Sequence, residues 1–202
     1  MTAYQYAPRT NKELKEIADI ILHRFPDRRR GYSVEVEGIV EDLGITILPR
    51  PISKIPIDGY VAADCRYILV NELQFRLPNR LRFTVAEELS HLILEFHLWE
   101  NGKVPEGARC HEISQETWRA IERDAKQLAA SILLPEDVFQ ERFAFHYTDL
   151  RSANIDEETS TKIAIKKTAF EMRASNRAAA NRAYDLRIIN DTQREHLFPV
   201  LL

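Results

Sequence analysis

Three residues in the segment RFTVAEELSHLILEFH (residues 82–97) have side chains and a spacing suited to catalysis. Glu87 and His91 are four positions apart, so on a helix they lie on one face, with Glu88 turned about 100° to the side. The neighbouring residues are mostly apolar, and a carboxylate buried among apolar groups needs a partner or takes up a proton. A divalent cation would be such a partner.

Glu122 is the candidate for a third metal ligand. It lies in a predicted helix over residues 115–134, in register with the apolar residues that face the core. Glu87, His91 and Glu122 would form a three-ligand metal site with an open position for water. Glu88 would then be the general base that takes the proton of that water.

The same residues also have ordinary structural interpretations. Two adjacent glutamates most often form a solvated face, and a Glu-His pair at four-residue spacing is often only a surface ion pair. A di-iron carboxylate bundle also uses Glu-x-x-His, but it needs a second copy of that motif, and the sequence has none.

Hydrophobic periodicity predicts the elements that position these residues. Helices are expected over residues 11–25, 36–43, about 79–99, 115–134, about 135–146, 158–172 and 176–188. A strand is expected over residues 45–48 and an irregular hairpin over 58–71, whereas the prolines of PRPISKIP exclude a central strand. These elements indicate one compact α+β unit with a helical C-terminal extension.

Composition narrows the class of protein. The 202 residues suffice for one well-buried core, and the net charge of -3 argues against a chain that wraps nucleic acid over its whole surface. The sequence contains no run of eighteen apolar residues and no apolar signal region, so we expect neither a membrane span nor export. Two cysteines are too few for a disulfide framework, which favours a cytoplasmic location.

Three stretches resemble motifs of the ImmA/IrrE family of metallo-endopeptidases. They are ILVN (68–71), RFTVAEELSH (82–91) and IERDAKQLAASILLP (121–135). The resemblance implies a zincin-like α+β domain over residues 1–147, with a small mixed sheet packed on helices. It also implies a helical C-terminal extension, residues 148–202, packed on that domain.

The resemblance further implies roles for individual residues. His91 matches the second zinc histidine, Glu88 the general base and Glu122 the glutamate ligand. Such relatives cleave a partner at a specific site, often a helix-turn-helix repressor, in phage, mobile-element or stress-response circuits. We therefore expect a cytoplasmic, metal-dependent endopeptidase-like protein that acts on a regulatory protein or peptide.

Glu87 departs from the family pattern, which has the first zinc histidine at this position. A His-His-Glu shell leaves a Zn²⁺ site at net +1, whereas Glu-His-Glu makes it neutral, so the pKa of bound water is lowered less. The oxygen-rich shell suits Mn²⁺ or Fe²⁺ better. The alternatives are therefore zinc, manganese, iron or no metal, and either reduced activity or an inactive pseudo-peptidase that binds a peptide or partner protein.

Two further features suggest contacts with partners. Tyr60, Val61 and Ala62 lie on a predicted strand whose edge could pair with an extended substrate peptide, or could be covered by a loop. The tail is rich in basic residues that could form a DNA-associated regulator, although such charge is more often a solvated helix face, so we do not expect DNA binding. These residues are Lys162, Lys166, Lys167, Arg173, Arg177, Arg182 and Arg187.

Overall fold

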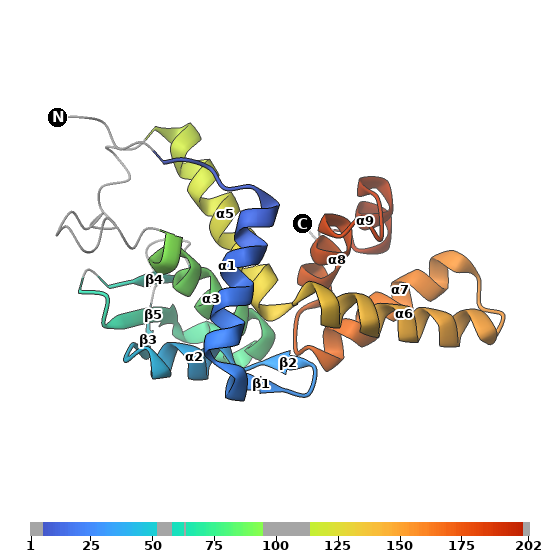
Figure 1. Cartoon of the computed structure of the whole chain (residues 1–202), viewed down its shortest axis with the longest axis horizontal. Helices are drawn as coiled ribbons and strands as arrows, with labels where there is room; N and C mark the ends of the chain where they lie inside the picture. The colour runs from blue at the N-terminus through green and yellow to red at the C-terminus, as the bar shows by residue number, and fades with distance from the viewer. Residues whose placement is uncertain (1–5, 52–57, 63, 95–113, 200–202) are drawn as a thin grey trace. The chain divides into compact units, whose positions relative to one another are not determined.

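The computed structural model describes residues 6–51, 58–62, 64–94 and 114–199 (Figure 1). The chain divides into two compact units, which are described separately. Unit 1 comprises Met1–Arg28 and Glu35–Ile132, and unit 2 comprises Arg29–Val34 and Leu133–Leu202. The domain boundary expected between residues 147 and 148 stays a prediction; it falls within helix α6 (Glu136–Ser152) of unit 2.

Unit 1 contains a three-stranded mixed sheet. Its strands are β3 (Thr46–Arg50), β4 (Gly59–Val61) and β5 (Tyr67–Asn71), in the order β3-β5-β4. β3 pairs with β5 in parallel, and β4 pairs with β5 antiparallel, which confirms the predicted hairpin. Pro49 cannot donate a backbone hydrogen bond, and among the described residues it lies on an edge strand, where that loss is tolerated.

Unit 1 also contains helices. They are α1 (Asn11–Arg24), α2 (Val36–Asp42), α3 (Pro78–Leu94) and α5 (Gln115–Leu133, whose last residue is assigned to unit 2), with short 3-10 turns η1 (Pro26–Arg28) and η2 (Glu72–Arg76). α3 packs against β4, β5 and α2, so the predicted small mixed sheet packed on helices is confirmed. The predicted end of the α3 helix, near residue 99, lies outside the described residues.

The core of unit 1 joins the sheet to α3 and α5. Its members are apolar side chains with at most 1% of their surface exposed: Leu14, Ala18, Val36, Ile39, Val40, Ile68, Val70, Val85, Ala86, Leu89, Ile121, Ala125, Leu128, Ala129 and Ile132. In α3 and α5 these residues recur at helical spacing, which fixes the rotation of both helices about their axes. That rotation decides where the polar residues between them point.

Unit 2 is mainly helical. It contains the two-stranded ribbon β1 (Arg29–Arg30) and β2 (Ser33–Val34), and the helices α6 (Glu136–Ser152), α7 (Glu157–Glu171), α8 (Asn176–Asp185) and α9 (Asp191–Leu197). α7 packs against both α6 and α8. α6 is longer than the short helix expected over 135–146, and neither α9 nor the ribbon was expected from the sequence.

Candidate metal site

Helix α3 holds Glu87 and His91 at the border of the core. Val85, Ala86 and Leu89 are fully buried, so they fix which side of α3 faces inward. Glu87 and His91 lie beside that buried side, with 20% and 14% of their side-chain surface exposed. Both are therefore partly desolvated but can still be reached from solvent.

Glu122 of α5 completes the cluster. Its Oε1 lies 3.3 Å from Nε2 of His91, and one ligand atom from each of Glu87, His91 and Glu122 lies within 4.8 Å of the others. Ligands about 2.0–2.2 Å from a zinc ion are themselves separated by up to about 4 Å. Two carboxylates and an imidazole at this spacing fit a divalent cation after small side-chain movements, and the predicted convergence of these three residues is present.

Lys126 is a fourth member of the cluster that sequence reasoning did not identify. Its Nζ lies 3.1 Å from Oε2 of Glu122 and 3.6 Å from Oε1 of Glu87. The contact with Glu122 follows from four-residue spacing on α5 and is visible in the sequence. The contact with Glu87 depends on how α3 meets α5, and no sequence pattern reports it.

The two carboxyl groups have unlike affinities for protons. Burial raises the pKa of Glu87 above its ordinary value, and the charge of Lys126 offsets this only in part. Burial acts in the same direction on Glu122, but the hydrogen bond with His91 and the contact with Lys126 outweigh it, so the pKa of Glu122 is lowered. Glu122 therefore stays ionised to lower pH than Glu87, which takes up a proton more readily.

Glu88 lies where strand β4 approaches α3. A Cβ atom added to Gly59 would come within 2.8 Å of Cγ2 of Thr84 and within 3.4 Å of Cγ of Glu88. The missing side chain at position 59 thus lets the β4 backbone lie against the helix beside Glu88. Tyr60 and Val61, predicted to bind substrate, belong to this strand, and Ala62 follows it.

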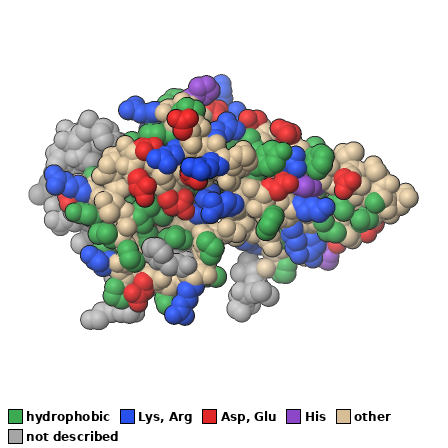
Figure 2. Space-filling view, turned by 90° about the horizontal axis from the view of Figure 1, so that it is seen from below, with side chains coloured by type: hydrophobic (Ala, Val, Ile, Leu, Met, Phe, Trp, Pro, Cys, Tyr) green, Lys and Arg blue, Asp and Glu red, His purple; other side chains and the backbone are tan. Residues whose placement is uncertain are grey.

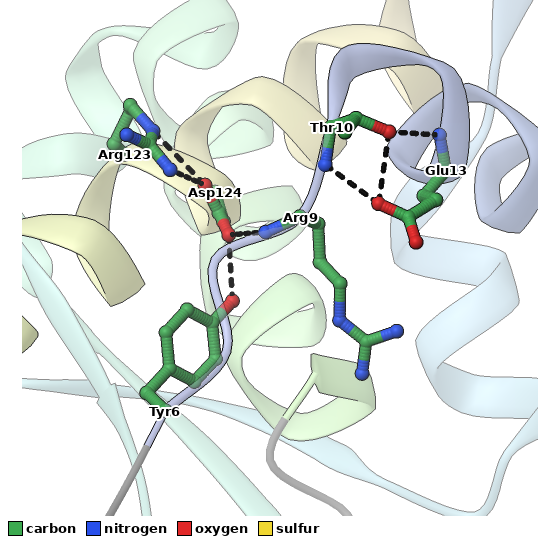
Figure 3. A network of polar contacts seen from close by, with 6 residues as sticks. All are labelled: Tyr6, Arg9, Thr10, Glu13, Arg123 and Asp124. Carbon is green, nitrogen blue, oxygen red and sulfur yellow. Dashed lines mark hydrogen bonds and ion pairs between the residues drawn. The ribbon is translucent and has the colours of Figure 1, made fainter.

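Asp124, two residues after Glu122 on α5, has a buried carboxylate that anchors this helix (Figure 3). Asp124 is fully buried, and its Oδ2 accepts hydrogen bonds from the hydroxyl of Tyr6 at 2.9 Å and the backbone N–H of Arg9 at 2.7 Å. Its Oδ1 accepts two hydrogen bonds from Arg123. The segment containing Tyr6 and Arg9 is thereby tied to the helix that carries Glu122.

An α+β fold in which the helix that carries Glu87 and His91 packs against β4, an edge strand among the described residues, is of the zincin-like type. The chain belongs to a peptidase family whose model is described as the IrrE N-terminal-like domain and matches residues 40–175, a range that includes all four residues of the cluster.

Comparison with solved structures confirms the fold. A Mycobacterium tuberculosis transcriptional regulator superposes with a TM-score of 0.58 at 16% sequence identity, over 91% of this chain. This chain spans 50% of the length of that regulator. No curated protein matches the sequence. None of the described helices is long and apolar enough to cross a membrane.

Proposed function

We propose that this protein is a cytoplasmic metal-dependent endopeptidase that cleaves a regulatory protein, such as a helix-turn-helix repressor. The observation that carries the proposal is the meeting of Glu87, His91 and Glu122 from two helices, with Glu88 beside an edge strand. The similar Mycobacterium tuberculosis protein is a transcriptional regulator, which supports a role in gene regulation. Zinc is the proposed ion, with manganese or iron as alternatives suited to the two carboxylates.

Each element of the site has a defined task in such a reaction. Glu87, His91 and Glu122 would hold the ion, which when bound supplies positive charge to polarise the scissile carbonyl. Glu88 would accept a proton from the attacking water and return it to the leaving amine. The edge of β4 would pair with the backbone of an extended substrate, which gives affinity with little dependence on sequence.

A pseudo-peptidase is the second candidate, because Glu87 stands in place of a neutral ligand. With Glu87 and Glu122 both ionised, the shell cancels the charge of a divalent ion, so water in the site is acidified less. In that case the β4 edge would still bind a peptide or partner protein without cutting it.

We do not propose DNA binding through the C-terminal helices. Arg182 is buried, with 4% of its surface exposed, and donates to the carbonyl of Leu134, and Arg177 donates to the carbonyl of Phe198. These two basic residues therefore have structural roles. Basic and acidic side chains are also interspersed on the face drawn in Figure 2.

Metal analysis tests the proposal most directly. Protein purified without chelator is expected to contain about one ion per chain, and His91→Ala should lose it. Glu88→Gln should keep the ion, because Glu88 is not a proposed ligand, but should lose hydrolysis. Cleavage can be detected by comparing new N-termini in a cell lysate after incubation with wild-type protein or with Glu88→Gln.

The outcomes separate the candidates. Metal bound by both wild-type protein and Glu88→Gln, with new N-termini only for the wild type, supports the peptidase. Bound metal without cleavage favours the pseudo-peptidase. Metal content that is unaffected by His91→Ala would contradict the proposed ligand set.

A further inference from the structure

Lys126 contacts both carboxylates of the proposed metal site, Glu87 on α3 and Glu122 on α5. A lysine four residues after a glutamate on one helix is ordinarily a surface ion pair of little consequence. Here the ammonium group also lies 3.6 Å from Glu87 of α3, which helical spacing on α5 does not require. The side chain thus bridges the pair of anions that a metal would otherwise neutralise.

A divalent ion and the ammonium group of Lys126 would compete for the charge of the same two carboxyl groups. A divalent ion needs lone pairs of Glu87 and Glu122, and the ammonium group of Lys126 already lies 3.6 and 3.1 Å from one oxygen of each. A metal placed among the three ligands would also face a like charge a few ångströms away. Binding of the metal is therefore opposed as long as the ammonium group stays.

The ammonium group of Lys126 can move away from the two carboxylates into solvent. The side chain of Lys126 is 55% exposed, whereas those of Glu87 and Glu122 are 20% and 25% exposed. Lysine has a flexible four-carbon stem and a strongly hydrated head group, so movement into solvent requires only rotation of the side chain. The carboxylates, by contrast, remain in place on α3 and α5.

We propose that Lys126 is the resident counter-cation of the metal-free site, and that a divalent ion enters only by displacing its ammonium group. The inference rests on the metal site of the proposed function and adds a residue that sets its affinity. Lys126 lowers the affinity of the site for metal and keeps the two carboxylates together when no metal is bound.

The test is calorimetric titration of the chelator-stripped full chain with zinc and with manganese. Lys126→Met should bind the ion at least about tenfold more tightly than wild-type protein, equivalent to about 1.4 kcal/mol. Lys126→Gln should show the same gain, and Lys126→Arg, which keeps the charge, should not. Lys12→Met is the matched control, because Lys12 also pairs with a glutamate four residues away, on α1.

Thermal unfolding gives a second readout. Without metal, Lys126→Met should melt at a lower temperature than wild-type protein, because Glu87 and Glu122 lose their counter-charge, and added metal should reverse the loss. Lys12→Met should behave as wild type in both conditions.

Each calorimetric result supports or overturns the inference. Tighter binding by Lys126→Met than by wild-type protein supports it. If only this variant binds, the inference is supported but the proposed metal-dependent activity of the wild-type protein is contradicted. Equal or weaker binding by Lys126→Met overturns it but leaves the metal site intact. If no form binds zinc or manganese, both the metal site and the inference are wrong.

Discussion

Gly59 of strand β4 lies close to Glu88 of helix α3, where the strand packs against the helix. The nearest atoms to a Cβ added at Gly59 are Cγ2 of Thr84 at 2.8 Å, the carbonyl oxygen of Leu69 at 3.0 Å and Cγ of Glu88 at 3.4 Å. A strand that carries any larger residue here would be pushed away from the helix. Glu88, the proposed base, can therefore lie close to β4, the proposed substrate-binding strand, because residue 59 has a hydrogen atom where other residues have a side chain.

Replacing Gly59 by alanine should lower both stability and activity. The added methyl group overlaps Thr84 and the Leu69 carbonyl, and overpacking of this kind costs about 1–3 kcal/mol. Urea unfolding measures the loss. The double variant Gly59→Ala/Thr84→Ser, which removes the nearest methyl group, should recover part of it, and no recovery would place the strain elsewhere.

Replacing Glu87 by histidine should raise zinc affinity by at least about tenfold. The change restores a neutral imidazole ligand, which zinc favours, and removes one of the two carboxylates that hold Lys126 over the site. Competition with a zinc-binding dye measures the affinity. Glu87→Gln is the control, since it removes the charge without offering an imidazole and should weaken binding; equal affinities for all three proteins would contradict the assigned geometry.

Replacing Asp124 by asparagine should destabilise unit 1. The buried carboxylate accepts hydrogen bonds from Tyr6, Arg9 and Arg123, and loss of bonds to a charged group costs about 1.5–3 kcal/mol. Tyr6→Phe removes one of these bonds and should cost only about 1 kcal/mol. Hydrogen exchange at the Arg9 amide measures the bond from this amide to Asp124 directly. Unchanged protection of the amide in Asp124→Asn would contradict a stabilising role of the carboxylate.

Protonation of Glu171 in acid should lower the stability of unit 2. The pKa of Glu171 is lowered chiefly by its hydrogen bonds from Arg142; burial opposes this, and His146 at 3.0 Å adds to the lowering. A carboxyl with a lowered pKa in the folded state contributes stability above its ordinary value of 4.5, and this is lost as the pH falls through the folded value.

The comparison with Glu171→Gln isolates this contribution. The stability advantage of wild-type protein over the variant should be full at neutral pH and should shrink between about pH 5 and pH 3. Denaturant unfolding at several pH values measures it. A constant difference across that range would mean that the titration of Glu171 is not linked to folding.

The ligand cluster could be anticipated because helical register carries the information. Glu122 shares a face of its helix with buried residues, and Glu87 and His91 lie one turn apart, so a meeting of the two helices follows from the pattern of apolar residues. Lys126 and Asp124 could not be assigned in this way. A charged residue on a helix ordinarily indicates a solvated face, and only the packing of distant segments brings Lys126 to Glu87 and Asp124 to Tyr6 and Arg9.

Short elements could not be predicted from the sequence for a related reason. Strands of two residues, such as β1 and β2, contain too few positions for an alternating pattern, and the run of arginines at 28–30 suggests a charged loop. Helix α9 has only seven residues; its beginning is marked by the Asn190-Gln193 capping box rather than by periodicity. The longer helices can be predicted because their apolar patterns repeat over several turns.

The bond between Tyr6 and Asp124 joins residues 118 positions apart. During synthesis Tyr6 leaves the ribosome long before Asp124 of α5 is made, and pairings so remote in sequence are slow to close. Completion of the helix that carries Glu122 would therefore be a late event, and a half-made chain would hold no finished site.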